Sequence, residues 1–273
     1  MFPHTIPSKM LQRQVKVTVV GAGGSGSQML TGLAQLHHAM LSLGHPGGLD
    51  VTAIDGDVVS ASNVGRQLFY ICDIGRNKAE VLINRINVTM GTHWQAIDSM
   101  LTENQSIQSD IVIGCVDSRK ARQVIKRAGS IYGGGYWLDL GNRQHDGQVI
   151  LGEFESPRWS QDQGRVRLPH VGDLFPETCD PAMDGEDSGP SCSLAEALEK
   201  QSLFINRGVS LYALNLLFEL FRYGGLSHHG VFVNLKTGRT NPLAVDPEAW
   251  KRFGYGLPEP KKKRSSRAKK PKA

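Results

Sequence analysis

VKVTVVGAGGSGSQML, residues 15–30, places a short β-branched run directly before a glycine-rich turn. The run Val15–Val20 predicts a buried strand, because β-branched side chains fit a pleated sheet. Apolar residues recur at helical spacing through Ser27–Leu43, and LDVTAI at Leu49–Ile54 predicts a second strand. A strand, a helix and a strand in this order predict one β-α-β unit with parallel strands and a right-handed crossover.

The turn itself fits the pattern G-x-G-x-x-G at Gly21, Gly23 and Gly26, with Gly24 as a further glycine. Glycine permits a tight turn and a close approach of the backbone to phosphate oxygens. The helix that follows offers free N–H groups and a partial positive charge to an anion. In this context the pattern predicts that these four glycines bind a nucleotide; the alternative is a tight structural turn.

The alternation of strands and helices continues along the chain. A continuous apolar run such as DIVIGCVD, Asp110–Asp117, is typical of a strand buried on both faces. We therefore expect an α/β fold, a Rossmann-like doubly wound sheet with mixed, parallel plus antiparallel, strands. The further predicted strands are Trp94–Ile97, Tyr136–Asn142, Gln148–Glu155, Val231–Gly238 and Pro242–Val245, and the further predicted helices are Asn77–Met90, Ser118–Gly129, Ser193–Lys200 and Phe204–Tyr223.

The composition, with 40% hydrophobic and 21% charged residues, is that of an ordinary globular protein. Residues 1–258 are expected to form one domain, whose first half, 15–135, holds the predicted nucleotide site. No apolar run approaches the roughly 18–20 residues that cross a bilayer, and the N-terminus lacks the apolar centre of a signal peptide. A cytoplasmic protein without membrane contact is the expectation.

The last thirteen residues, KKKRSSRAKKPKA at 261–273, hold eight of the 31 lysines and arginines and no acid. The remaining chain has 23 basic and 26 acidic residues, so the net charge of +5 arises from this end. Residues 259–273 are expected to be a disordered basic tail. Such lysines bind phosphates in a sequence-independent way, so non-specific nucleic-acid contact and a merely solubilising tail both stay open.

Four cysteines, Cys72, Cys115, Cys179 and Cys192, include no C-x-x-C pair. Structural zinc sites usually take their thiolates in such close pairs, so no zinc is expected. Cys72 and Cys115 are interpreted as small core residues.

Asp55 ends the second predicted strand, where a carboxylate normally accepts hydrogen bonds from ribose hydroxyls. NAD and ATP both carry this ribose, so the residue does not distinguish between them. A surface aspartate at a strand end is the structural alternative.

Three further stretches distinguish ATP from NAD as the expected cofactor. They are IDGDVVSASNVGRQLFY at Ile54–Tyr70, GRNKAE at Gly75–Glu80 and CVDSR at Cys115–Arg119. Together they resemble the ThiF/MoeB/ubiquitin-activating-enzyme superfamily, over roughly residues 15–245. That family shows D-x-D-x-V-x-x-S-N-x-x-R-Q after its second strand, a lysine at the start of the next helix and an aspartate at the end of the fourth strand. Within it, the chain is most similar to the ThiF-family members of bacterial PRTRC gene systems.

The resemblance implies that the chain adenylates the C-terminal carboxylate of a ubiquitin-like or sulfur-carrier small protein, with ATP and Mg²⁺ as cofactors. Asp55 matches the ribose-binding aspartate, and Asp57, the second aspartate of the motif, is a further expected cofactor contact. Asp117 matches the acid that helps to hold Mg²⁺ at the α-phosphate. Mg²⁺ usually takes one or two carboxylates besides phosphate oxygens, which agrees with this role.

Asn63, Arg66 and Lys78 match the polar and cationic residues around the ATP phosphates, and Gln67 matches a motif residue without an assigned role. Attack of a carboxylate on the α-phosphate brings two anions together. Arg66 and Lys78 can offset that repulsion and stabilise the departing pyrophosphate, so with Asp117 they are the expected catalytic residues. Taken singly, such cations are most often solvated surface charges.

Some members of the family pass the acyl group to a cysteine as a thioester. LFPETCDPAMDGEDSGPSCSL, residues 174–194, resembles the crossover segment of ubiquitin-type activating enzymes. It lies in a long polar crossover loop, about 156–192, of the expected partner-binding half, 136–258. The resemblance makes Cys179 the candidate nucleophile and Cys192 the alternative.

Thioester transfer needs a thiolate and access to it. A mobile loop would provide the access, but the acids around Cys179 should raise the pKa of its thiol. A basic partner from elsewhere would be needed, and Arg165 and His170 are candidates. The structural alternative is that neither loop cysteine reacts.

Family relatives carry an N-terminal helix whose arginine reaches into the partner subunit's ATP site, and a homodimer is the family expectation. About fourteen residues precede the first predicted strand here, and Arg13 is the sole arginine among them. Because Arg13 lies so close to the strand, the source of this arginine stays open.

Two other functions share part of this evidence. A nicotinamide-dependent oxidoreductase would use the same glycines and Asp55. A non-catalytic nucleotide-binding adaptor would keep the fold and use its basic tail on nucleic acid. Arg66, Lys78 and Asp117 favour the activating enzyme, since a dehydrogenase needs no cations at a triphosphate position.

Overall fold

The fold is taken from a computed structural model, which describes residues 3–132, 135–155, 166–184, 195, 198–199 and 201–256. Within these residues the main sheet contains β2 (Val15–Val20), β3 (Leu49–Ile54), β4 (Gln95–Ile97), β5 (Ile111–Gly114), β6 (Tyr136–Asn142), β7 (Asp146–Glu153), β9 (His228–Asn234) and β10 (Arg239–Ala244). Their order across the sheet is β10-β9-β7-β6-β5-β2-β3-β4. Strands β2 to β6 pair in parallel, and β7, β9 and β10 add antiparallel pairs. The expected Rossmann-like mixed α/β sheet is confirmed.

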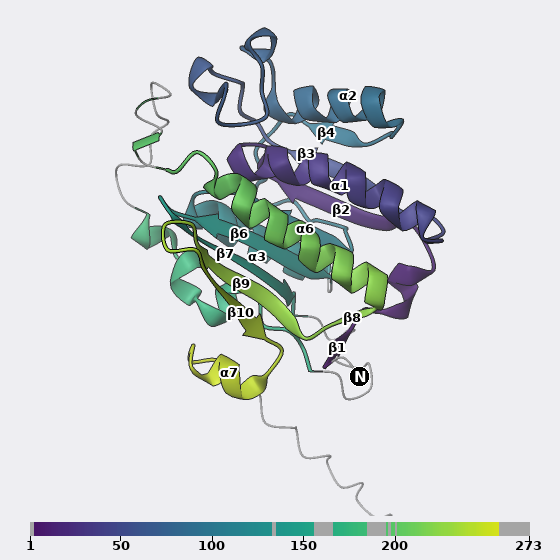
Figure 1. Ribbon diagram of the computed structural model, residues 1–273, viewed down its shortest axis with the longest axis vertical. Coiled ribbons are helices and arrows are strands. Elements are labelled where there is room, and N and C mark those ends of the chain that lie inside the picture. The colour runs from purple at the N-terminus through teal and green to yellow at the C-terminus, as the bar shows by residue number, and fades with distance from the viewer. Residues whose placement is uncertain are drawn as a thin grey trace, which may run out of the picture.

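The longer helices lie on the two faces of this sheet. They are α1 (Gly24–Ser42), α2 (Lys78–Met90), α3 (Arg119–Tyr132) and α6 (Ile205–Tyr223). Helices α1 and α6 pack side by side over one face (Figure 1). Helix α3 covers the other face, where Ile125 lies close to Gly114 of β5 and to the indole of Trp137.

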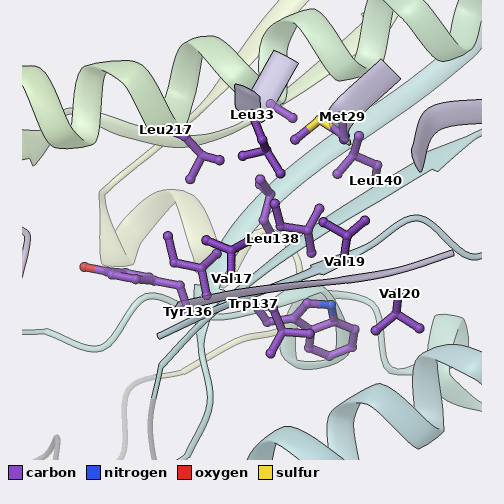
Figure 2. Packing of buried hydrophobic residues seen from close by; sticks show 14 of the residues in the cluster. Val17, Val19, Val20, Met29, Leu33, Tyr136, Trp137, Leu138, Leu140 and Leu217 are labelled. Atoms are coloured by element: carbon purple, nitrogen blue, oxygen red, sulfur yellow. The ribbon is translucent and has the colours of Figure 1, made fainter. Parts of the chain in front are cut away.

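Side chains of β6 alternate between the two layers of the core. Figure 2 shows Leu138 and Leu140 on the side of α1 and α6, with Leu33 and Leu217 from those helices, and Trp137 on the opposite side. All five are fully or almost fully buried. Burial on both faces explains why the parallel strands read as continuous apolar runs in the sequence.

The topology places the glycine loop, residues 21–26, at a switch point of the sheet. From β2 the chain proceeds to β3 and β4 on one side and then returns to β5 on the other side of β2. Open α/β sheets bind their ligands at such a point, beyond the carboxyl ends of the strands. Asp55 and Asp57 follow β3 and Asp117 follows β5, so all three predicted acids belong to this edge.

The predicted elements within the described residues agree with the structure apart from shifts at their ends. The largest shift is in β9, which is predicted over Val231–Gly238 and found over His228–Asn234, and β5 also ends early. The strand predicted over Asp110–Asp117 ends at Gly114. Beyond it, Cys115 N still donates to Val20 O at 2.8 Å, but Cys115 and Val116 turn over the glycine loop. The backbone leaves the sheet there in order to pass close to Gly21.

Several short elements were not predicted from the sequence. They are β1 (His4–Thr5) paired with β8 (Gly225–Leu226), the 3₁₀ turns η1 (Ser8–Leu11), η2 (Ala61–Asn63), η3 (Ile71–Asp73), η4 (Pro176–Cys179) and η5 (Pro181–Met183), and the helices α4 (Val171–Leu174) and α7 (Pro247–Lys251). Most of the predicted helix Ser193–Lys200 and all of the predicted tail lie outside the described residues. In the described part, no helix is both long and apolar enough to cross a membrane.

Candidate functional site

The glycine loop closes tightly where β2 passes into α1. Gly21 has a φ of +91°, which favours glycine, and a Cβ there would lie 2.5 Å from the carbonyl oxygen of Cys115. A Cβ on Gly26 would overlap the carbonyl oxygen of Gly21, and one on Gly24 would lie 2.5 Å from Asn206 Nδ2. Backbone packing therefore requires glycine at Gly21 and Gly26, and a side chain at position 24 would have to displace Asn206.

Gly23 differs from these three because the space beside it is open. The nearest atoms to a Cβ there are the amide atoms of Gln67, at 3.9 Å. Gly23 is also the N-cap of α1, whose first-turn N–H groups have no partner within the helix. An anion that approaches Gly23 thus meets free N–H groups and the positive end of the helix dipole.

Asp55 holds the glycine loop to the end of β3. Its Oδ2 accepts from Ala22 N at 2.5 Å, and its Oδ1 accepts from Asp57 N at 2.8 Å. Burial raises the pKa of this carboxyl, while the two N–H groups act in the opposite direction. Each carboxylate oxygen keeps a second lone pair, so the predicted ribose contact is compatible with these bonds.

Lys78, the first residue of α2, is buried and paired with Asp57. Its Nζ lies 2.8 Å from Asp57 Oδ2, and the side chain of Lys78 is 11% exposed whereas that of Asp57 is 52% exposed. Asn77 caps α2 by accepting from Glu80 N and also donates to Asp55 O at 2.8 Å. The structure thus brings Lys78 to the switch point, beside a carboxylate that faces solvent.

Arg66 and Gln67 each have an unpaired polar atom, and the amide of Gln67 lies beside the open side of the glycine loop. Arg66 Nε and Gln67 Oε1 are buried and make no hydrogen bond within the described residues. Burial lowers the pKa of the Arg66 guanidinium. An unpaired buried polar atom costs on the order of 1–3 kcal/mol, so its presence suggests a polar group that binds here.

The start of α6 covers the glycine loop, a contact that sequence reasoning missed. Arg66 Nη1 donates to Gln201 Oε1 at 3.2 Å, and Asn206 Nδ2 donates to the same oxygen at 2.9 Å. Ser25 Oγ donates to Asn206 Oδ1 at 3.0 Å, and Ser210 Oγ donates to Ser25 O at 3.2 Å. No local pattern signals this contact, because the two partners come from opposite ends of the chain.

Asn63 and Asp117 stand outside that network. Asn63 is buried, and its Oδ1 accepts from Ser60 N at 2.9 Å, which organises the turn η2. Asp117 is exposed beyond β5, and the side chain of its neighbour Val116 lies 3.5 Å from where a Cβ on Gly21 would be. Asp117 therefore stands at the rim of the glycine loop with a carboxylate open to solvent.

A buried ion pair that was not predicted lies behind Asp117. Arg122 Nε lies 3.0 Å from Asp139 Oδ1 and 3.2 Å from Oδ2, and Arg122 Nη2 donates to Leu140 O at 3.4 Å. The Asp139 carboxylate raises the pKa of Arg122, and burial raises the pKa of Asp139. The charge on Arg122 is thereby balanced inside the protein.

The sequence model of the ThiF family matches residues 8–160, which is more than half of the chain and includes the glycine loop, Asp55, Arg66, Lys78 and Asp117. The chain belongs to the ThiF family. The resemblance stated from the motifs alone is thereby confirmed at the level of the family.

Curated relatives agree with this ThiF-family assignment. The chain is 32% identical over 191 residues to the NEDD8-activating enzyme E1 catalytic subunit of Dictyostelium discoideum, which covers 68% of this chain and 40% of the relative. It is 34% identical over 117 residues to the protein of the same name from Arabidopsis thaliana, which covers 41% of this chain and 23% of the relative. The chain therefore spans less than half the length of the curated relatives it matches.

One solved structure supports the fold across most of the ThiF-family chain. The crystal structure of selenomethionine PaaA covers 85% of this chain and 64% of its own, with a TM-score of 0.56 at 16% sequence identity. At this identity the likeness concerns the fold alone.

Cys179 lies beyond the part of the chain that matches the ThiF model. It ends η4, which packs against α3, and it is 8% exposed. The prediction of a mobile loop that exposes Cys179 is wrong for residues 171–184, because these residues form short helical turns, of which η4 and η5 pack on α3 and α4 packs on η4 and β7. Burial is the main factor that raises the pKa of the thiol, and the hydroxyl of Thr178 lowers it.

Cys72 and Cys115, both predicted to be core residues, differ in their exposure. Cys72 is exposed in η3, so its interpretation as a core residue is wrong. Cys115 is partly buried beside the glycine loop, and burial raises the pKa of its thiol. Cys192 and the candidate partner Arg165 lie outside the described residues.

Arg13 is engaged within its own chain. Its Nη1 and Nη2 donate to the two carboxylate oxygens of Asp110 at 2.8 and 2.6 Å. Asp110 also accepts from Lys16 N at 3.0 Å. This bidentate pair holds the side chain of Arg13 next to β2.

Asp184 ties the Cys179 segment, residues 171–184, to the start of α3. Its Oδ1 accepts from Arg119 N at 2.9 Å and its Oδ2 from Lys120 N at 3.0 Å. These two bonds lower the pKa of the Asp184 carboxyl. The carboxylate therefore satisfies first-turn N–H groups of α3 and closes the segment over Cys179.

We expect Asp184→Ala to make Cys179 more accessible, because the end of its segment loses both bonds to α3. The alkylation rate of Cys179, measured by peptide mass spectrometry, should rise about three- to tenfold, which corresponds to the loss of a helix cap. Glu177→Ala, which removes an exposed carboxylate from the same segment, is the control and should leave the rate unchanged. Equal rates in Asp184→Ala and the native protein would show that Asp184 does not hold the segment closed.

Proposed function

We propose that this chain uses ATP to adenylate the C-terminal carboxylate of a small ubiquitin-like or sulfur-carrier protein and releases pyrophosphate. The observation that supports this most is the pair of unpaired buried atoms, Arg66 Nε and Gln67 Oε1, the second of which lies beside the open side of Gly23. A nucleotide offers partners to both, since its phosphate oxygens accept hydrogen bonds and its hydroxyl and amino groups donate them. The name of the Dictyostelium relative, a NEDD8-activating catalytic subunit, agrees with this proposal.

The proposed reaction brings a carboxylate to the α-phosphate, and two cations offset the repulsion. An oxygen of the substrate carboxylate bonds to the α-phosphorus, and the bond from that phosphorus to the β-phosphate oxygen breaks. Arg66 would bind phosphate oxygens through its free Nε, and Lys78 would exchange the exposed partner Asp57 for a phosphate. The N-terminus of α1 adds further positive potential at Gly23.

Mg²⁺ fits this site through Asp117. The described residues contain no group of three or more His, Cys, Asp and Glu side chains that could hold a metal by itself. Mg²⁺ in nucleotide sites is held by one or two carboxylates and by substrate phosphates, so a single exposed carboxylate at the strand end suits it. When bound, the ion would withdraw charge from the phosphate oxygens.

Binding measurements separate the proposal from the oxidoreductase alternative. We expect ATP with Mg²⁺ to bind with micromolar affinity in calorimetry, and NADH to bind at least about tenfold more weakly. In this proposal the Arg66 guanidinium and the Lys78 ammonium supply the cations that a triphosphate needs, and a dinucleotide carries no γ-phosphate. Tight NADH binding without ATP binding would favour the oxidoreductase, and ATP binding without turnover would favour the adaptor.

The remaining parts of the proposal rest on the family resemblance or on the composition of the chain. They are thioester transfer to Cys179, with Cys192 as the alternative; a homodimer; membership of the PRTRC-type group; and one domain over residues 1–258 followed by a basic tail. The tail could also add salt-sensitive contact with nucleic acid. A cytoplasmic location belongs to the same group of expectations.

A further inference from the structure

Side chains from two helices and from a loop surround one point beside Gly172, a residue of α4. A Cβ on Gly172 would lie 3.0 Å from Cys179 Sγ, 3.4 Å from Lys126 Cδ and 3.4 Å from His170 Cε1. Lys126 lies on α3, one turn after Arg122, and both residues face the segment that carries Cys179. The sulfur therefore has two cationic side chains on one helix as neighbours.

Arg122 and Lys126 differ in whether a carboxylate balances their charge. Arg122 is held by Asp139 in a buried pair, so its charge is balanced where it stands. The ammonium of Lys126 forms no ion pair with any residue that the structure describes, and Lys126 is only partly buried. Burial raises the pKa of the Cys179 thiol and Asp139 adds to the rise, while the Thr178 hydroxyl, Lys126 and Arg122 act in the opposite direction.

His170 does not serve as the base that the sequence analysis considered. It is 1% exposed, and burial, together with Arg167 and Lys126, lowers its pKa to about 3. So weak a base takes up little of a thiol proton at neutral pH. Its Nδ1 lies 3.3 Å from Asp173 Oδ2, on a side chain that is buried, and makes no hydrogen bond within the described residues.

We propose that Lys126 is the residue that makes Cys179 a nucleophile, because its unbalanced ammonium stabilises the Cys179 thiolate. This inference deepens the thioester step and rests on the proposed function. The thiol proton passes to solvent, the thiolate sulfur bonds to the carbonyl carbon of the acyl adenylate, and the bond from that carbon to the phosphate oxygen breaks, which releases AMP. Lys126 acts through the sulfur and need not touch the acyl group.

The test is the pH profile of Cys179 alkylation by iodoacetamide, read by peptide mass spectrometry, with exposed Cys72 as the reference in the same sample. We expect Lys126→Gln to move the profile to higher pH and to slow the reaction at neutral pH about tenfold, which corresponds to one pKa unit. Lys126→Arg should restore the native profile. Lys120→Gln, which removes an exposed cation from the same helix, should change nothing.

If Lys126 acted through packing alone, its substitution would change the rate of Cys179 alkylation in the opposite direction. Loss of its stem would then open the segment and speed alkylation at every pH, and that result, or an unshifted profile, would overturn the proposal. Lys126→Met keeps most of the stem and should give the same shift as Lys126→Gln if charge is the cause; a native profile in Lys126→Met would also overturn it. The assay contains neither ATP nor a partner protein, so failure of adenylation would leave its result intact.

Discussion

Gly26→Ala is expected to destabilise the protein and to abolish nucleotide binding, because the new Cβ would overlap the carbonyl oxygen of Gly21. The clash is with backbone, which cannot turn aside as a flexible side chain can. We expect a loss of about 2–3 kcal/mol in the free energy of unfolding, typical of overpacking. Thermal unfolding should therefore shift downward by roughly 5–10 °C for a domain of this size.

Two other glycines supply the comparison. Gly208→Ala lies on α6, where a Cβ would meet only Leu235 at 3.6 Å, so it should leave the protein unchanged or slightly more stable. Gly23→Ala meets nothing closer than 3.9 Å, so its fold should persist while ATP affinity falls about a hundredfold, since a methyl group displaces the phosphate. Native ATP affinity in a folded Gly23→Ala variant would show that the phosphates bind elsewhere.

Arg66→Gln is expected to weaken ATP binding about tenfold or more and to slow pyrophosphate exchange about 10²–10³-fold. The larger second effect follows because Arg66 is assigned to the transition state, and removal of one such donor has this order of cost. Stability should change little, because Arg66 Nε has no partner to lose and Gln201 keeps its bond to Asn206.

Arg252→Gln, an exposed arginine after α7, is the matched control and should behave like the native protein in calorimetry and in exchange. Equal losses in both variants would indicate a general effect of charge. Exchange that survives in Arg66→Gln at the native rate would remove Arg66 from the proposed mechanism.

Much of the fold could be predicted because its signals are local. The run Val15–Val20, the glycines after it and the helical spacing that follows lie within one stretch of chain. The buried parallel strands can be recognised as apolar runs. The same holds for Asp55 and Lys78, which sit next to element ends that the pattern defines. The structure accordingly places both at the switch point.

The rest of the site depends on contacts between distant segments. Two examples are the hydrogen bond from Ser25 to Asn206 and the ion pair between Arg122 and Asp139. In both, the sequence around each residue gives no indication of its partner. The Cys179 segment shows the same limit, since its polar composition predicts a mobile loop while packing on α3 decides its structure. The predicted rise in the pKa of the Cys179 thiol agrees with the structure in direction, but burial is its main cause, and the nearby Asp184 carboxylate turns to the start of α3.

The central claim is ATP-dependent adenylation, and exchange of labelled pyrophosphate into ATP tests it most directly. The native protein should catalyse exchange that requires Mg²⁺ and a small ubiquitin-like protein ending in a free glycine carboxylate. Truncation of that glycine or omission of Mg²⁺ should abolish the signal. Folded protein that binds ATP but shows no exchange with any such candidate would contradict the account.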